Sequence, residues 1–407
     1  MTKEDELIRA DFPLLNDNDI IYLDNTATSQ KPKKVIDDVA EFYKTLNSNP
    51  MRGLYDISVE ATRKVEEARK KTASFINAKD PSEIIFTRNA TEGLNLVAYT
   101  YGEENLSEGD EVLITIAEHH SNFLPWKRLC ERKKAVLKIF ECDDTGAFSL
   151  DAFKAELTKK TKIVAMSAMS NVFGRDNRLE PFVEAAHESG AVFVADGAQS
   201  VPHVRTDVLQ SNVDFLSFSG HKMFAPMGIG VLYGKMDLLQ KMPPFLSGGE
   251  MIEYVHRDSE RYSEPPHKFE AGTLNAGGIV GLLSALDFIE SVGFSNIISR
   301  EEDLSEYLMK GLSNIPHVKV LGAAEGKDHH GIFTFTVDGV HPHDISEIMS
   351  SKNICIRAGH HCAQPLHEFL GIRSTARASL GYYNTKDDID AFLSTLSEIR
   401  SVMGYGD

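Results

Sequence analysis

Short, continuous apolar runs alternate with longer helical patterns over the first two thirds of the chain. The runs are Ile84–Phe86, Val112–Ile116, Ile163–Met166, Val192–Ala195, Phe215–Phe218 and Ile229–Tyr233. A strand that is apolar at every position is buried on both faces, and such strands occur in parallel sheets covered by helices. The sequence therefore predicts an α/β fold on a largely parallel sheet. An amphipathic helix with apolar residues from Val35 to Leu46 is expected before it.

The pattern changes after about residue 290. Strands such as Val318–Leu321 and Ile332–Val337 are shorter or alternate, and helical patterns flank them after Ser295 and after Thr385. We expect a large α/β domain over residues 21–289 and a smaller α+β domain formed by residues 1–20 and 290–407. The segment Glu250–Pro266, rich in proline and polar residues, is expected to be an exposed loop.

Composition excludes several classes of function. The 407 residues carry a net charge of −17 without a long basic run, which argues against nucleic acid or an anionic membrane as the main partner. No apolar stretch is long enough to span a bilayer, and the charged first 20 residues do not resemble a secretory signal. The four cysteines are scattered without a Cys-x-x-Cys pair, so we expect no disulfide framework, no metal site and a cytoplasmic location.

Asp196 and Lys222 each follow an apolar run, one helix and one strand apart. In open parallel sheets the ligand lies beyond the carboxyl ends of the strands. A carboxylate and a lysine at the tips of neighbouring strands suit pyridoxal phosphate, because the lysine can form a Schiff base and the carboxylate can hold the pyridine nitrogen protonated. An ordinary strand-end aspartate and a surface lysine account for the pair equally well.

Two further loops favour a phosphate site. Thr91 lies where a predicted strand leads into a helix, so its hydroxyl and the unpaired N–H groups there can hold a phosphate. The alternative is that Thr91 is only a helix N-cap. Ser219 and His221 precede Lys222 and supply a second hydroxyl and an imidazole.

His119 follows a predicted strand directly after Glu118. A neutral imidazole at this position can stack on a flat cofactor ring and move a proton. A lone histidine is more often structural, and we assign that role to the neighbouring His120.

Cys362 lies in a Gly- and Pro-containing segment near Arg357. An exposed cysteine near cationic groups can react as a thiolate, whereas a buried cysteine is inert. We expect burial for the other three cysteines, Cys130, Cys142 and Cys355. Arg377, among small residues, can clamp a carboxylate, although a surface salt bridge is the alternative.

In this order the motifs resemble those of the cysteine desulfurases, in the class-V aminotransferase (NifS) family of pyridoxal-phosphate fold type I, and most closely the SufS type, or group II. The matching segments are Ala90-Thr-Glu-Gly, Glu118-His-His-Ser-Asn, Asp196-Gly-Ala-Gln, Ser219-Gly-His-Lys, Phe269-Glu-Ala-Gly-Thr and Arg357-Ala-Gly-His-His-Cys-Ala-Gln-Pro. The resemblance implies a seven-stranded sheet, pyridoxal 5′-phosphate as cofactor, and conversion of L-cysteine to L-alanine. The sulfur would pass to an enzyme cysteine as a persulfide, for iron–sulfur cluster assembly.

The resemblance also implies a role for each site residue. Lys222 would hold the cofactor and shuttle protons, His119 would stack on its ring, and Cys362 would take the sulfur. The other cofactor contacts would come from Thr91, Asp196, Gln199, Ser219, His221 and, across a homodimer, Thr273. Asn171 and Arg377, with Arg357 close by, would hold the substrate carboxylate.

The chain departs from the family pattern at Met51, Tyr55, Ala168 and Met227, around the expected substrate entrance.

His343 lies in a segment that resembles the one with which some SufS enzymes meet a zinc-containing acceptor of SufU type. An acceptor of SufE type is the other possibility. A turn with incidental histidines accounts for this segment equally well. A selenocysteine lyase and a sulfur-carrier protein of low turnover are the alternative functions.

Overall fold

The computed structural model describes residues 1–405, and within this range the largest sheet has seven strands in the order β2-β8-β7-β6-β5-β3-β4. The strands are β2 (Ile84–Thr87), β3 (Glu111–Thr115), β4 (Val136–Phe140), β5 (Thr161–Ser167), β6 (Val192–Asp196), β7 (Phe215–Ser219) and β8 (Gly230–Gly234). β8 runs antiparallel to β2 and β7, and the pairs from β7 to β4 are all parallel. The prediction of a largely parallel sheet is confirmed.

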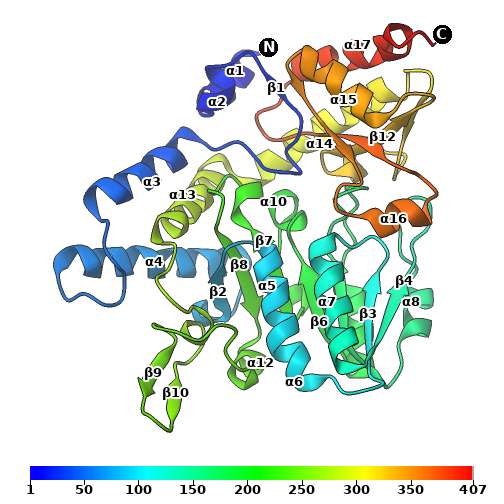
Figure 1. Cartoon of the computed structure of the whole chain (residues 1–407). Helices are drawn as coiled ribbons and strands as arrows, with labels where there is room; N and C mark the ends of the chain where they lie inside the picture. The colour runs from blue at the N-terminus through cyan, green and yellow to red at the C-terminus, as the bar shows by residue number, and fades with distance from the viewer. Residues whose placement is uncertain (406–407) are drawn as a thin grey trace.

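Helices cover both faces of this sheet (Figure 1). In β5, Val164 and Met166 belong to one apolar cluster whereas Ile163 and Ala165 belong to the other. Helices α4 (Asp56–Phe75), α9 (Glu180–Ser189) and α13 (Ala276–Val292) contribute to the first cluster, and α5 (Ala90–Val97) and α7 (His120–Lys133) to the second. Burial on alternate sides explains why the strands are apolar at every position. β4 was not predicted from the sequence, because it is a partly exposed edge strand and lacks a continuous apolar run.

Shorter helices complete this part of the chain. The predicted amphipathic helix is α3 (Lys33–Thr45), which buries Val35 and Phe42. The others are α6 (Glu103–Asn105), α8 (Leu150–Glu156), α10 (Ser200–His203), α11 (Val208–Ser211) and α12 (Met236–Lys241). Among residues 1–405 no single helix is long and apolar enough to cross a membrane; α13 and α14 (Phe294–Leu312) meet that test only as a pair bent by 75°.

The C-terminal part is built on a four-stranded antiparallel sheet with the order β11-β12-β15-β14. These strands are β11 (Val318–Val320), β12 (Ile332–Val337), β14 (Arg357–Gly359) and β15 (Thr375–Ser379). Helices α14, α15 (Pro342–Ser351) and α17 (Lys386–Val402) pack against it around a separate apolar cluster. The short helix α16 (Gln364–Phe369) lies between β14 and β15 in the chain. The prediction of a smaller α+β unit is confirmed.

The N-terminus joins the C-terminal part. Helix α1 (Lys3–Ala10), which is followed by α2 (Pro13–Asn16), places Arg9 Nη1 3.1 Å from the carboxylate of Asp388 in α17. Strand β1 (Ile21–Tyr22) pairs in parallel with β13 (Ile354–Cys355). Both termini accordingly lie at the same end of the molecule (Figure 1). The domain limits at residues 20/21 and 289/290 stay a prediction.

The segment Glu250–Pro266 is exposed over most of its length, as expected, but it is not a simple loop. It contains an antiparallel hairpin of β9 (Ile252–Val255) and β10 (Glu260–Tyr262), which projects from the body of the molecule (Figure 1). Its strands are too short and too polar to give an alternating pattern.

Candidate active site

A cavity of about 220 Å³ lies beyond the carboxyl ends of the parallel strands, where the C-terminal part meets the large sheet. Loops after β2, β3, β5, β6 and β7 line one wall, and β14, β15 and the loop between them contribute to the other. The predicted site residues that line it are Thr91, His119, Asn171, Asp196, Gln199, Ser219, His221, Lys222, Arg357, Cys362 and Arg377. Thr273 lies outside this cavity and is exposed.

Asp196 and Lys222 both face this cavity. Asp196 ends β6, is 4% exposed and accepts a hydrogen bond from the N–H of Ala198 at 2.9 Å. Burial raises the pKa of Asp196, so its carboxylate favours a cationic partner. Burial lowers the pKa of the Lys222 amine to about 8, against the opposing charge of Asp196. A larger share of this amine is therefore neutral, and nucleophilic, than of an ordinary lysine.

Hydroxyl groups gather at one end of the cavity. The N-cap of α5 is Asn89, whose side chain accepts from the N–H of Glu92, so the alternative that Thr91 is the N-cap is wrong. The Thr91 hydroxyl instead lies 2.7 Å from the hydroxyl of Ser121. Ser219 Oγ accepts from the N–H of Ala90 at 2.9 Å, which brings the end of β7 against the start of α5. This end of the cavity has the donors that an anion requires.

His119 and His120 have different functions at the start of α7. His119 is the N-cap, and its Nδ1 accepts from the N–H of Ser121 at 3.1 Å. Burial lowers the pKa of His119 to about 3, so the ring is neutral and its proton is on Nε2. The N–H of His120 donates to the Cys362 carbonyl at 2.7 Å, and its Nε2 accepts from the N–H of Gln364 at 3.2 Å. His120 thus anchors the cysteine loop, in agreement with a structural role.

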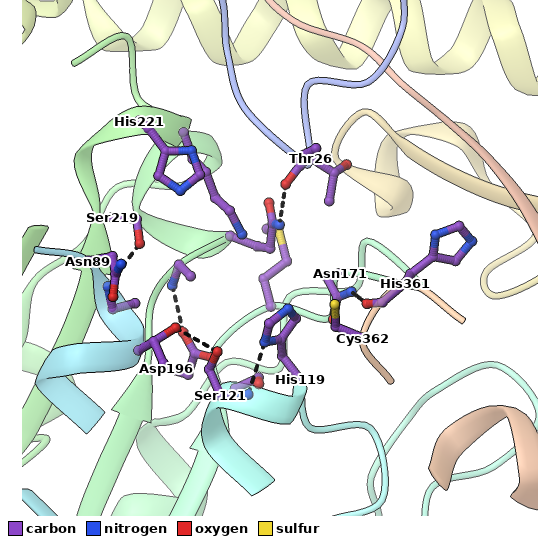
Figure 2. A pocket seen from close by; sticks show the side chains of 18 of the residues that line it. Thr26, Asn89, His119, Ser121, Asn171, Asp196, Ser219, His221, His361 and Cys362 are labelled. Carbon is purple, nitrogen blue, oxygen red and sulfur yellow. Dashed lines mark hydrogen bonds between the residues drawn. The ribbon is translucent and has the colours of Figure 1, made fainter. Parts of the chain in front are cut away.

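Cys362 is held in a strained turn. His361 and Cys362 have φ of 52° and 57°, in the left-handed region that residues with a Cβ rarely adopt. Asn171 Nδ2 donates to the His361 carbonyl at 2.6 Å, and His361 Nε2 lies 2.9 Å from the Thr375 hydroxyl. Figure 2 shows Asn89 and Ser219 on one side of the pocket and Asn171, His361 and Cys362 on the other. The sulfur is therefore presented opposite the hydroxyl-rich end.

The other cysteines lie outside the cavity. Cys130 and Cys142 are buried, as predicted, and burial raises the pKa of each thiol to about 11. Cys355 is partly exposed, so the expectation that it packs in the core is wrong. In β13 the neighbouring Ile354 packs in the C-terminal apolar cluster. Successive side chains of a strand point to opposite faces, so Cys355 points away from that cluster.

Arg377 is enclosed rather than on the surface. The residue is 2% exposed, Nη1 donates to the Asn171 carbonyl at 3.0 Å, and Nη2 lies 3.4 Å from the carboxylate of Asp24. Its Nε is buried without a hydrogen-bond partner in the described part of the chain. Burial lowers the pKa of Arg377 to about 10. The surface salt bridge considered from the sequence is wrong, and an unsatisfied guanidinium facing a cavity suits a carboxylate ligand.

Several residues that line the cavity were not predicted: Thr26, Asn89, Ser121, Met169 and His361. Asn89 and Ser121 each stand beside a predicted residue at the start of a helix, and that position was the available signal. Thr26 belongs to an irregular segment after β1, where no periodicity marks a site.

Comparisons with known proteins agree with this geometry. The family model for aminotransferase class-V matches residues 21–392. A relative from Synechocystis sp. named "Probable cysteine desulfurase" is 44% identical over 394 residues, which cover 96% of this chain and 94% of that protein. One of the same name from Streptomyces coelicolor is 42% identical over 408 residues, with 98% of each protein covered.

Solved structures give the same result. The apo structure of cysteine desulfurase from Thermococcus onnurineus NA1 superposes with a TM-score of 0.94 at 40% identity and covers 98% of both chains. The cysteine desulfurase CsdA (S-sulfonic acid) from Escherichia coli superposes with a TM-score of 0.91 at 34% identity, covering 99% of this chain and 100% of that one. Fold, sequence and family model agree, and this chain belongs to the aminotransferase class-V family.

Proposed function

We propose that this chain is a cysteine desulfurase that converts L-cysteine to L-alanine and takes the sulfur on Cys362 as a persulfide. The observation that carries the proposal is the convergence of Lys222, Asp196, Arg377 and Cys362 on one cavity. A lysine and an aspartate alone suit many reactions of amino acids. A thiol facing the same cavity supplies a sulfur acceptor. Relatives of this chain are named cysteine desulfurases, in agreement with that chemistry.

Pyridoxal 5′-phosphate fits the residues present. Five polar atoms in the lining are buried without a hydrogen-bond partner among residues 1–405, and His221 Nδ1 and Gln199 Oε1 are two of them. Thr91, Ser219 and His221 would hold the phosphate, and Asp196 would pair with the ring nitrogen. Gln199 would bond the phenolic oxygen, His119 would stack on the ring, and Lys222 would hold the aldehyde carbon. When bound, the cofactor would supply an electron sink for the substrate carbanion.

The remaining groups handle the substrate. Arg377, whose Nε has no partner in the described chain, binds the carboxylate of L-cysteine, with Asn171 and Arg357 beside it. The Lys222 amine accepts the α-proton, because burial brings its pKa to about 8, near the working range of a base. The Cys362 loop is already fixed by His120 and Asn171, so little conformational freedom is lost when the thiolate reacts.

The sulfur transfer balances without an external oxidant. The Cys362 thiolate attacks the sulfur of the substrate, and an S–S bond forms as the substrate's C–S bond breaks. The electron pair stays on the substrate carbon, which takes up a proton, so alanine is the reduced product and the persulfide is the oxidised one. An acceptor thiol can then remove the outer sulfur by exchange.

The proposal includes a cytoplasmic homodimer of SufS type, feeding iron–sulfur cluster assembly. Thr273 is exposed and outside the cavity of its own chain, which supports a role at the phosphate of the partner subunit. The chain departs from the family's sequence pattern at Met51, Tyr55 and Met227, and these three apolar side chains are exposed. Exposed apolar side chains around the expected substrate entrance support an entrance that the partner subunit covers. His343 is exposed in the first turn of α15, which packs on β14, and would meet an acceptor of SufU type; an acceptor of SufE type is the second choice.

One assay tests the function. Purified protein loaded with pyridoxal 5′-phosphate is given L-cysteine or L-selenocysteine, with and without a SufU-type acceptor, and alanine is quantified. Alanine from cysteine well above a cofactor-only control is expected, with a higher rate when the acceptor is present. Turnover confined to selenocysteine would identify a selenocysteine lyase, and no turnover of either would leave a sulfur-carrier protein.

A further inference from the structure

The segment Asp24–Lys31 contacts functional residues on both sheets. Near its start, the Asp24 carboxylate lies 3.4 Å from Arg377 on β15. The carbonyl of Thr26 accepts from Nε2 of Gln199, after β6, at 3.0 Å. At its other end the segment reaches the turn that carries Lys222. The segment therefore connects the groups proposed to bind the carboxylate and the cofactor.

The contact at that turn centres on one carbonyl group. The oxygen of His221 accepts from the N–H of Ser29 at 3.0 Å, the Thr28 hydroxyl at 3.0 Å, the Ser29 hydroxyl at 3.2 Å and Nζ of Lys31 at 2.9 Å. A carbonyl oxygen has two lone pairs, so this acceptor is fully used. The same peptide group continues into the nitrogen of Lys222. The donors thus fix the backbone on which the active lysine is mounted.

Lys31 is the unusual member of this set. Its Nζ also donates to the Ser29 carbonyl and lies 3.4 Å from the Thr28 hydroxyl. Lys31 is half-buried, no carboxylate within residues 1–405 raises its pKa, and burial lowers this pKa to about 7. Burying an amine that lacks an acidic partner is unfavourable unless polar groups compensate. Here the compensating acceptors are uncharged, and one of them is the carbonyl next to Lys222.

We propose that Lys31 is a positioning residue, which holds the His221–Lys222 peptide and so aims the Lys222 amine into the cavity. The inference rests on the proposed function, in which Lys222 is the reactive amine. Lys31 does not line the cavity, so it acts through the peptide and does not touch the substrate. Its hydrogen bonds go to Ser29, Thr28 and His221 and not to Arg377, so removal of its amine should change steps at Lys222 and spare carboxylate binding.

The test compares three substitutions. Lys31→Met keeps an unbranched apolar stem but removes the donors, Lys31→Arg keeps N–H donors, and Lys33→Met removes an exposed lysine two residues away as the control. Apoprotein is mixed with pyridoxal 5′-phosphate, samples are reduced with borohydride over time, and mass spectrometry measures cofactor fixed on Lys222. Steady-state kcat and KM for cysteine, and thermal unfolding of the apoproteins, are measured on the same samples.

We expect Lys31→Met to attach the cofactor about tenfold more slowly and to lower kcat about tenfold with KM unchanged, in line with loss of one hydrogen bond. Lys31→Arg should recover most of both rates, and Lys33→Met should match the wild type. Attachment and kcat at the wild-type level in Lys31→Met would overturn the inference. Equal losses in Lys31→Met and Lys31→Arg that follow their unfolding temperatures would also overturn it, because they indicate only a structural role.

Two further results separate this inference from the proposed function. If Lys31→Met does not fold, Thr28→Val removes a neighbouring donor to the same carbonyl and must slow attachment, or the inference fails. If the wild type fixes the cofactor on Lys222 but makes no alanine from cysteine, the function is wrong while the attachment rates still decide the role of Lys31. If the wild type fixes no cofactor on Lys222, both fail.

Discussion

The pKa of Lys222 predicts how cofactor attachment depends on pH. Only the neutral amine attacks the aldehyde, and burial lowers the pKa of this amine from 10.5 to about 8. At pH 7 roughly one amine in ten is then neutral, compared with roughly one in 3,000 at the unshifted value, an advantage of about 300-fold. The attachment rate should rise about tenfold per pH unit below pH 8 and level off above it.

The assay is stopped-flow absorbance of apoprotein mixed with pyridoxal 5′-phosphate between pH 6 and 10, with a free lysine derivative as reference. Asp196→Asn supplies a second arm. The charge of Asp196 opposes the effect of burial, so its removal should move the inflection to lower pH. A rate that keeps rising with the free lysine beyond pH 10, or an inflection in Asp196→Asn shifted upward, would refute this reasoning.

Three further substitutions have defined outcomes. Arg377→Lys should raise KM for cysteine about 100-fold and change kcat less, as steady-state kinetics will measure, because a lysine cannot keep both the bond to the Asn171 carbonyl and a forked contact to a carboxylate; an unchanged KM would exclude Arg377 as the carboxylate site. Glu118→Gln should lower the free energy of unfolding by about 1–3 kcal/mol in urea titration, because the buried carboxylate accepts from four donors and an amide cannot; wild-type stability would contradict this. Gly174→Ala should lower the free energy of unfolding by about 2–4 kcal/mol in the same titration, because φ is +68° and the added Cβ would lie 1.9 Å from the His329 carbonyl oxygen. A soluble variant of wild-type stability would show that this contact relaxes.

The sheet could be predicted because its strands are buried on both faces. Continuous apolar runs such as Ile163–Met166 are typical of strands in a covered sheet, and the polar residues at their ends mark the ligand edge. β4 and the β9–β10 hairpin lack that signal, since both are partly or largely exposed. The reversed direction of β8 leaves no trace in composition, because an antiparallel strand in the middle of a sheet is equally apolar.

The residues of the candidate site could be predicted only where a reactive side chain marks them. Lys222 and Cys362 have reactive side chains, so their chemistry is visible in the sequence. Lys31 donates to the carbonyl of His221, and the carbonyl of Thr26 accepts from the side chain of Gln199; such contacts between distant loops depend on tertiary structure alone. Roles that require a second subunit, as for Thr273, stay predictions.

Persulfide formation on Cys362 is the central claim, and mass spectrometry tests it directly. Wild type, Cys362→Ala and Cys355→Ala, each loaded with cofactor, are given L-cysteine without acceptor, alkylated and digested. The control replaces the other partly exposed cysteine, which lies outside the cavity. We predict one extra sulfur atom on the Cys362 peptide in the wild type and in Cys355→Ala, and none on any peptide of Cys362→Ala. A persulfide of wild-type yield in Cys362→Ala would contradict the account.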